Sequence, residues 1–162
     1  MNVAFSSDAH LGHKLAATKR GFSSVERHDE AVISSYKDVC TKRTHLWLLG
    51  DVSFTVGGLE RLRELPGKKI LVRGNHDNLR VNYADYFDEI YGIVKYKNMW
   101  ISHMPPHPQE LYRCKAFLHG HLHKDSNSPE LEFPFINVNW DYWHRAVDLD
   151  EIKGMIEKVR KM

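Results

Sequence analysis

The chain has 162 residues, of which 42% are hydrophobic and 27% charged, and its formal net charge is +2. A chain of this length buries roughly 70% of its unfolded surface, so it requires neither a disulfide nor a structural metal to fold. The weak charge excludes an electrostatic argument for nucleic-acid binding, and no apolar stretch approaches the length of a transmembrane helix. Two separated cysteines, Cys40 and Cys114, argue against a disulfide framework. We expect a single domain over residues 1–162, in the cytoplasm and without a membrane partner.

The first half of the chain alternates strand and helix patterns. Apolar runs predict three strands, at Val3–Phe5, His45–Leu49 and Lys69–Val72. Between them, Ser24 is a suitable N-cap for an amphipathic helix over residues 25–41. A shorter helix with Leu59, Leu62 and Leu65 is stopped by Pro66-Gly67. This alternation predicts a parallel sheet covered by helices.

The second half has more strands and fewer helices. The predicted strands are Ile90–Tyr96, Met99–His103, Ala116–Leu118 and Phe135–Val138. Lys97-Asn98 is a tight-turn signal between the first two, and Asp148 is a suitable cap for a final helix through Val159. We expect a more antiparallel arrangement here. The segments expected to act as specificity loops are Leu11–Ser23, Pro105–Lys115 and Lys124–Pro134.

Short clusters of histidine, aspartate and asparagine end or closely follow the predicted strands. The chain has 11 histidines, more than a structural role alone would require. The clusters are Asp8-Ala9-His10, Gly50-Asp51, Gly74-Asn75-His76-Asp77, His103 and Gly120-His121-Leu122-His123. Because loops at strand ends meet at one edge of a sheet, we expect these side chains to converge. Carboxylate, imidazole and amide donors in one place are what a two-metal hydrolytic site needs.

Each cluster taken alone has a simpler interpretation. Asp-x-His is a common loop pattern, Gly-Asp is a frequent turn, and Gly-His-Leu-His can be a hydrogen-bonded turn pair. Gly74-Asn75-His76-Asp77 is more specific, because four small or polar residues directly after a buried strand are hard to explain by packing. The ordered set is far more specific than its parts and favours a metal site.

The ordered set resembles the calcineurin-like metallophosphoesterase family. That family's pattern is Asp-x-His, Gly-Asp, Gly-Asn-His-(Asp or Glu), a single His, then Gly-His-x-His. All five blocks occur here in this order between residues 8 and 123, and the segments 8–13 and 137–152 also resemble small stand-alone bacterial and phage members. The resemblance implies an α/β fold of mixed sheets flanked by helices, of the four-layer α/β/β/α type, without a cap domain.

The resemblance also implies a role for each residue. Asp8, His10 and His123 would hold a first ion, Asn75, His103 and His121 a second, and Asp51 would bridge the two. His76 would contact the phosphate and protonate the leaving oxygen, and Asp77 would orient His76. The nitrogen and oxygen donors suit two divalent transition-metal ions, Mn²⁺ first, with Fe, Zn²⁺ and Ni²⁺ as alternatives.

The implied reaction is hydrolysis of a phosphodiester or a phosphomonoester by a hydroxide that bridges the ions, and we favour the diester. The expected substrate is a phosphate ester, with nucleotides among the candidates. Further phosphate contacts are assigned to His13, Arg80 and His107, although a surface or loop role explains each of these nearly as well.

Two other functions stay open at the level of sequence. A catalytically weak or inactive relative would use the same fold as a protein-binding scaffold, but such scaffolds usually lack a ligand, and none is missing here. A nuclease or RNA-processing phosphodiesterase would need a broad basic groove, which a net charge of +2 does not supply.

The remaining polar and aromatic residues carry weaker signals. Lys14, Lys19 and Arg20 favour an anionic substrate if they lie near the site, and are otherwise ordinary surface residues. The aromatic residues after the last predicted strand are interpreted as core or homodimer interface: Trp140, Tyr142 and Trp143. The histidines interpreted as structural are His28, His45 and His144.

Overall fold

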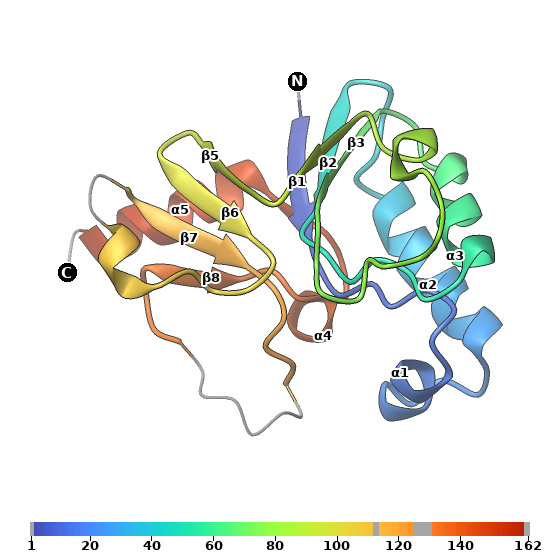
Figure 1. Cartoon of the computed structure of the whole chain (residues 1–162). Coiled ribbons are helices and arrows are strands. Elements are labelled where there is room, and N and C mark those ends of the chain that lie inside the picture. The colour runs from blue at the N-terminus through green and yellow to red at the C-terminus, as the bar shows by residue number, and fades with distance from the viewer. Residues whose placement is uncertain (1, 112–113, 125–130, 161–162) are drawn as a thin grey trace.

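The computed structural model describes residues 2–111, 114–124 and 131–160, which form two mixed β-sheets flanked by helices (Figure 1). The first sheet has the strand order β4-β3-β2-β1-β9. Its strands are β1 (Asn2–Ser6), β2 (Thr44–Leu48), β3 (Lys68–Val72), β4 (Glu89–Tyr91) and β9 (Val147–Asp148). β1 to β4 are parallel and β9 runs antiparallel to β1, which confirms the parallel sheet predicted for the first half.

The second sheet has the order β5-β6-β7-β8. Its strands are β5 (Ile93–Tyr96), β6 (Met99–Ser102), β7 (Ala116–His119) and β8 (Phe135–Asn137). In this sheet the β5–β6 pair is antiparallel, while β6, β7 and β8 are parallel. The second half is therefore more antiparallel than the first, as expected, although parallel pairs still predominate in this sheet. Lys97 and Asn98 both have positive φ, as a two-residue type I′ hairpin turn requires, which confirms the predicted turn.

The single strand predicted at Ile90–Tyr96 is two strands in two different sheets. β4 ends at Tyr91 and pairs with β3, whereas β5 begins at Ile93 and pairs with β6. Gly92 lies between them, and a Cβ at this position would meet no atom within 4 Å. At Gly92 the chain passes from the first sheet to the second. The sequence does not show this change of sheet, because the β-branched and aromatic residues on both sides of Gly92 suit a strand in either sheet.

Helices cover one face of the first sheet, and the second sheet lies on its other side (Figure 1). α2 (Val25–Lys37) begins at the predicted cap, where the Ser24 hydroxyl accepts a hydrogen bond from Arg27 N, but it ends four residues earlier than expected. The predicted short helix is found as α3 (Val56–Arg61), which contains Leu59 and continues as the 3₁₀ helix η1 (Leu62–Glu64) before Pro66-Gly67.

Two apolar clusters hold these layers together. Val32 and Ile33 of α2 pack with Leu46, Leu48 and other residues on one face of the first sheet. The opposite face packs against the second sheet in a separate cluster, whose members from β1, β2, β6 and β7 include Phe5, Trp47, Ile101 and Leu118. α5 (Leu149–Arg160) adds side chains to this cluster. Alternating side chains of each strand of the first sheet therefore reach different cores.

The last helix begins as predicted. Asp148 Oδ1 accepts hydrogen bonds from Asp150 N and Glu151 N at 2.8 and 2.9 Å, which confirms Asp148 as its cap. Among the described residues, no helix has both the length and the apolar character needed to cross a membrane.

Several short helices were not predicted from the sequence. They are α1 (Lys14–Lys19), α4 (Trp140–Trp143), η2 (Tyr83–Asp85) and η3 (Pro108–Leu111). α1 occupies the middle of the expected loop Leu11–Ser23, and its N-cap is His13, whose Nδ1 accepts from Ala16 N. Histidine is not a preferred N-cap, so the pattern gave no signal for this helix. Residues 112–113 and 125–130 of the other two expected loops lie outside the described residues.

One buried hydrogen bond joins α2 to β1. The Tyr36 hydroxyl donates to Ser6 Oγ at 3.0 Å, and both side chains are fully buried. Tyr36→Phe should lower the free energy of unfolding by about 0.5–1.5 kcal/mol, because Ser6 Oγ loses its buried partner. Urea unfolding measures this, with Tyr86→Phe as the matched control, since the exposed Tyr86 hydroxyl bonds Glu60 at the surface. Equal losses in the two variants would contradict the assignment.

Candidate metal centre

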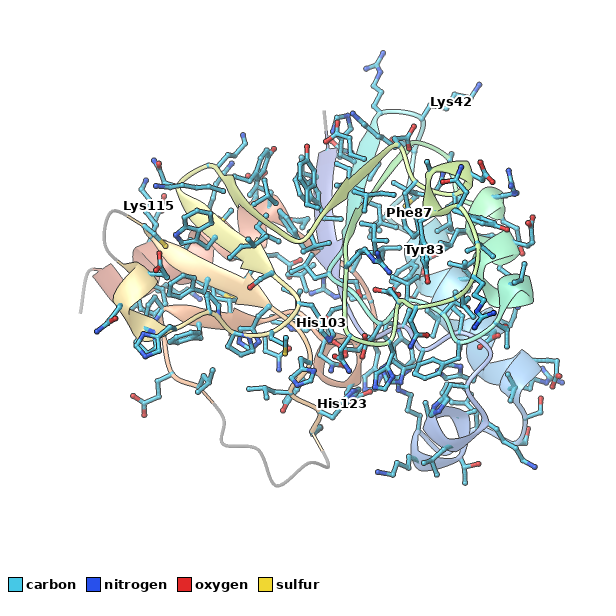
Figure 2. The ribbon with its side chains drawn as sticks, viewed as in Figure 1. Lys42, Tyr83, Phe87, His103, Lys115 and His123 are labelled. Carbon is cyan, nitrogen blue, oxygen red and sulfur yellow. The ribbon has the colours of Figure 1, made fainter. Side chains whose placement is uncertain are left out.

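The predicted clusters emerge from neighbouring strand ends of both sheets. In the first sheet, Asp8 follows β1, Asp51 follows β2 and Asn75 follows β3, and these three strands are adjacent. In the second sheet, His103 follows β6 and His121 follows β7. Figure 2 places His103 near the point where the two sheets approach each other, with His123 beside it. The topology therefore brings the donors together, as predicted from their positions after strands, but from strand ends of two sheets rather than from one edge of a single sheet.

The first group of donors consists of Asp8, His10 and His123, each of which offers one atom within 4.8 Å of the others. Asp8 Oδ1 lies 3.7 Å from His10 Nε2 and 3.4 Å from His123 Nε2. Asp8 and His10 are buried, and His123 is partly exposed. This geometry leaves three donor atoms facing a common point.

The second group consists of Asp51, His103 and His121. His103 Nε2 lies 3.4 Å from Asp51 Oδ2, 3.2 Å from His121 Nδ1 and 3.1 Å from Asn75 Oδ1. Asn75 therefore joins this group, as expected. The other ring nitrogen of His103 donates to the Leu49 carbonyl at 2.7 Å, which leaves Nε2 directed at the donors.

Asp51 connects the two groups. Its Oδ2 lies 3.4 Å from His103 Nε2 in the second group and 3.8 Å from His10 Nε2 in the first. A carboxylate in this position has the oxygens needed to serve both groups.

The donors fit a pair of divalent cations. Asp8 Oδ1 and His10 Nε2 are buried and have no hydrogen-bond partner within the described part of the chain. Polar atoms that are buried without a partner are costly, and a bound cation would satisfy both. The carboxylates, imidazoles and amide are nitrogen and oxygen donors that suit transition metals, and these groups contain no thiolate.

Four of the predicted ligands have left-handed backbones. The φ angles are 55° at Asp8, 51° at His10, 52° at Asp51 and 66° at His121. A left-handed conformation is uncommon for any residue other than glycine, although Asp and His tolerate it better than most, and it costs on the order of 1 kcal/mol or more. The strand ends hold these residues in a conformation that the isolated chain would disfavour.

Three glycines of the clusters allow backbone segments to approach the ligands. A Cβ at Gly120 would lie 2.3 Å from Asp8 Oδ2 and 2.2 Å from Ser7 Oγ. A Cβ at Gly74 would lie 2.3 Å from Asp51 Oδ1, and one at Gly50 would lie 2.6 Å from His103 Nδ1. The glycines in these motifs are therefore required by close packing against the ligands.

The charges of the two groups are strongly coupled. Burial raises the pKa of Asp51, but hydrogen bonding and charge from His103 outweigh it and bring this pKa to about 2. Burial lowers the pKa of His103, yet the carboxylates of Asp51 and Asp8 raise it to about 9. In the metal-free protein, a proton on His103 compensates part of the buried negative charge.

His76 and Asp77 have different environments. His76 is exposed, its backbone N–H donates to Asp51 Oδ1 at 2.9 Å, and its ring lies against Phe54 with centroids 5.1 Å apart. Asp77 was expected to orient His76. Its carboxylate instead accepts three backbone hydrogen bonds, from Asp51 N, Val52 N and Gly74 N, at 2.8–3.0 Å. Asp77 therefore ties the Asp51 loop to the Gly74 loop, and its predicted role is corrected.

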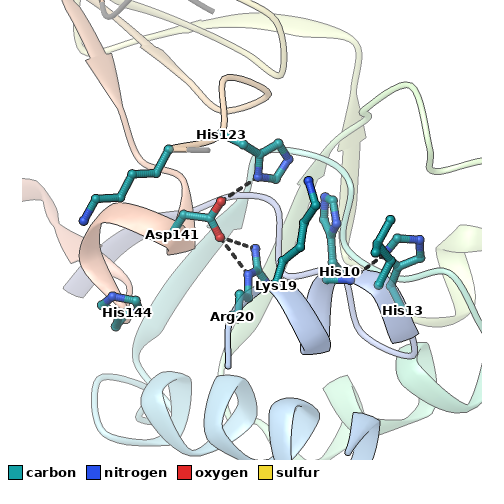
Figure 3. Close-up of a pocket in the computed structure, with 10 residues that line it drawn as sticks. His10, His13, Lys19, Arg20, His123, Asp141 and His144 are labelled. Atoms are coloured by element: carbon teal, nitrogen blue, oxygen red, sulfur yellow. Dashed lines mark hydrogen bonds and ion pairs between the residues drawn. The ribbon is translucent and has the colours of Figure 1, made fainter. Parts of the chain in front are cut away.

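Of the three residues predicted to contact substrate, the structure brings His13 near the metal groups. The His13 ring lies 5.7 Å from the His10 ring and 4.1 Å from the Phe54 ring. Both histidines line a cavity of about 490 Å³ that also includes His123 (Figure 3). Arg80 is exposed and is not among the residues that line this cavity. His107 is also exposed, and its Nδ1 accepts from Gln109 N.

Two residues beside the first group were not predicted to belong to the site. Asp141 Oδ2 accepts from His123 Nδ1 at 2.7 Å, and Arg20 binds the other Asp141 oxygen at 2.7 Å. Burial raises the pKa of Asp141, but His123 and Arg20 lower it to about 2. Arg20 is 121 residues away from Asp141 in sequence, so local pattern could not connect them. His28, which was interpreted as structural, is buried and contacts Arg20.

Solved structures of other proteins have folds similar to that of this chain. No protein family model matches the chain. The Gene 66 protein of Mycobacterium phage D29 is 28% identical, with 99% of this chain and 98% of that protein covered. A crystal structure of protein AQ665 of unknown function from Aquifex aeolicus has a TM-score of 0.78 at 25% identity, covering 95% of this chain and 98% of that one. The nuclease MPE of Pseudomonas putida has a TM-score of 0.52 at 19% identity, covering 75% and 61%, and shows similarity of fold alone.

The close approach at Gly120 predicts a specific sensitivity. Gly120→Ala should lower the free energy of unfolding by about 1–3 kcal/mol and weaken metal binding, because the methyl group displaces the Asp8 carboxylate. Gly57→Ala is the control, since a Cβ there meets nothing within 4 Å and the residue lies in α3. This control should stabilise the protein slightly. Thermal unfolding and metal titration measure both effects, and wild-type metal binding by Gly120→Ala would contradict the geometry.

The raised pKa of His103 predicts how pH acts on the metal-free protein. A raised pKa contributes stability that is fully present below about pH 6.5 and is lost as pH rises toward 9. The free energy of unfolding in chelator should therefore decrease by up to ~3 kcal/mol between these pH values. Affinity for Mn²⁺ should increase over the same range, because the ion replaces this proton. His103→Gln should remove most of the decrease, and an unchanged pH profile in this variant would refute the assignment.

Proposed function

We propose that this chain is a metal-dependent phosphoesterase of the calcineurin-like metallophosphoesterase type, built on that family's four-layer α/β/β/α fold without a cap domain. It would hold two divalent transition-metal ions, with Mn²⁺ the best candidate, and hydrolyse phosphodiesters in preference to phosphomonoesters. The observation that carries the proposal is the position of Asp51, whose carboxylate faces donor groups on both sides.

We assign a role to each expected ligand according to the donor group in which it lies. Asp8, His10 and His123 would hold the first ion. Asn75, His103 and His121 would hold the second, and Asp51 would contact both. When bound, the two ions would supply positive charge that lowers the pKa of water and offsets the charge developing on the phosphoryl group.

His76 would be the residue that transfers a proton. Its backbone N–H is fixed by Asp51, and its exposed ring packs against Phe54 beside the donor groups. We assign the ring to contact the phosphate and to donate a proton to the leaving oxygen. His13 is the second candidate for a phosphate contact, because His10 and His123 line the same cavity.

A protein-binding scaffold is the alternative from another class. Loss of a ligand would favour it, but all seven expected donors are present and six of them form the two groups. The Pseudomonas nuclease shares the fold only, so a nuclease activity for this chain would need direct measurement.

Hydrolysis of bis-p-nitrophenyl phosphate with added Mn²⁺ tests the function. Asp51→Asn should abolish turnover, because both groups lose a shared negative ligand. His76→Ala should lower kcat about 10²- to 10⁴-fold, as expected on removal of a general acid. His45→Gln is the control, because His45 lies near the start of β2, at the other end of the strand from Asp51. Activity that is equal in wild type and both site variants would exclude this site, and a wild type with neither bound metal nor activity would favour the scaffold.

A further inference from the structure

A single buried guanidinium lies behind the first donor group. Arg20 is the C-cap residue of α1, and its side chain is only 8% exposed. All three of its nitrogens donate hydrogen bonds, and their acceptors come from three separate parts of the chain. Burying a guanidinium this deeply is costly unless its donors are satisfied, so the acceptors around it form a built site for this side chain.

One set of contacts runs from Arg20 to His123. Arg20 Nε and Nη2 each lie 2.7 Å from Asp141 Oδ1, and Asp141 Oδ2 accepts from His123 Nδ1 at 2.7 Å (Figure 3). A neutral histidine that donates from Nδ1 has its lone pair on Nε2. That atom faces Asp8 Oδ1 at 3.4 Å, so Asp141 selects both the tautomer and the direction of His123.

A second set of contacts holds the backbone of the other two donors. Arg20 Nη2 donates to the Asp8 carbonyl at 2.7 Å, and Nη1 donates to the Ala9 carbonyl at 3.0 Å. These carbonyls lie within the segment in which Asp8 and His10 have left-handed φ. The same cation therefore supports the uncommon backbone that directs these two side chains.

A third set of contacts connects Arg20, through His28 and Asp29, to the loop after His10. Arg20 Nη1 lies 2.8 Å from His28 Nε2, and arginine has no acceptor, so His28 Nε2 accepts and Nδ1 carries the proton. His28 Nδ1 then donates to Asp29 Oδ1 at 2.8 Å. The Asp29 carboxylate accepts from Gly12 N at 2.9 Å, which fixes the chain two residues beyond His10.

We propose that Arg20 is a positioning residue for the first metal ion: one buried guanidinium fixes the His123 ring through Asp141 and the Asp8–His10 backbone directly. This inference rests on the two-metal function proposed above. The contacts of Arg20 within the described residues include none with Asp51, His103 or His121. The second group has separate support, from the Leu49 carbonyl for His103 and from the backbone N–H of His76 for Asp51. Arg20 therefore acts on one ion of the pair.

Lysine cannot take over this role. The lysine ammonium has one nitrogen, and all three of its donors start from that atom. The planar guanidinium fork of Arg20 has three nitrogens, which donate to different acceptors. Arg20→Lys keeps the charge and removes the fork. Asp141→Asn keeps the side-chain size but replaces one acceptor oxygen by an amide NH₂ group. This NH₂ group would face either His123 or Arg20, and each of these is itself a hydrogen-bond donor.

The test measures Mn²⁺ binding to the full chain by calorimetry, without substrate, together with metal content after gel filtration. The proteins are wild type, Arg20→Lys, Asp141→Asn and the matched control Arg145→Lys. Arg145 also makes a two-point contact with a carboxylate, that of Glu151, but away from the donor groups. We expect wild type and control to bind two ions, and both site variants to bind one of them about 10- to 100-fold more weakly. The affinity for the other ion should stay within about twofold, a selectivity that general destabilisation cannot produce.

The outcomes separate the two proposals. Wild-type affinity for both ions in Arg20→Lys and Asp141→Asn would overturn the role of Arg20, as would equal weakening at both sites in folded variants. If Arg20→Lys fails to fold, Asp141→Asn decides alone, since it leaves the Arg20 contacts to Asp8 and Ala9 in place. A wild type that binds fewer than two ions would instead refute the two-metal function.

Discussion

Two buried carboxylates, Asp8 and Asp51, face the same set of imidazoles, and their negative charge must be compensated for the domain to be stable. Both side chains are at most 3% exposed, and His10 Nε2 lies within 3.8 Å of each of them. Isolated ionised carboxylates at this depth would be strongly unfavourable. Backbone N–H groups provide part of the compensation, from His121 to Asp8 and from His76 to Asp51. A proton on His103 provides more in the metal-free protein, and bound cations would supply the rest.

This arrangement is stable because rigid elements hold the donor side chains in both groups. The parallel strands β1, β2 and β3 end side by side, and β6 and β7 bring two histidine clusters from the second sheet. The left-handed residues at these ends would relax in a free loop. They are retained because glycines let the neighbouring backbone pack against them and because Asp77 bonds two of the loops together.

Much of the donor set could be predicted from sequence because each donor is adjacent to a strand that is itself recognisable. Gly50-Asp51 and Gly120-His121 are local patterns, and parallel strands bring local patterns to a common edge. The crossing at Gly92 was missed because an apolar strand pattern does not say which sheet a strand joins. The role of Asp77 was misjudged for a related reason: adjacency to His76 suggested a contact, whereas its partners are backbone N–H groups, two of which lie 25 and 26 residues away.

The residues that hold the first donor group in place, Arg20 and Asp141, were the least predictable part of the site. Arg20 meets Asp141 across 121 residues, and α1, which carries Arg20, has six residues and a histidine cap. From the sequence, Arg20 was interpreted as one of three basic residues that would favour an anionic substrate near the site or otherwise be ordinary surface. Only the assembled fold shows that its charge is enclosed, and that α1, α2 and α4 are joined through it by Asp141 and His28.

The two donor groups consequently depend on the fold in different ways. His103 is held by a backbone carbonyl just after β2, so the second group is fixed as soon as the two sheets pack together. The first group also needs Asp141, which is placed only when the segment after β8 pairs beside Ser7, where Ser7 N donates to Val138 O and Trp140 N donates to Ser7 O. It further needs a short helix held by side chains rather than by a sheet. Under the proposed function, ion binding at the first group would therefore be coupled to the docking of the C-terminal segment and α1, whereas ion binding at the second group would be coupled mainly to the packing of the sheets.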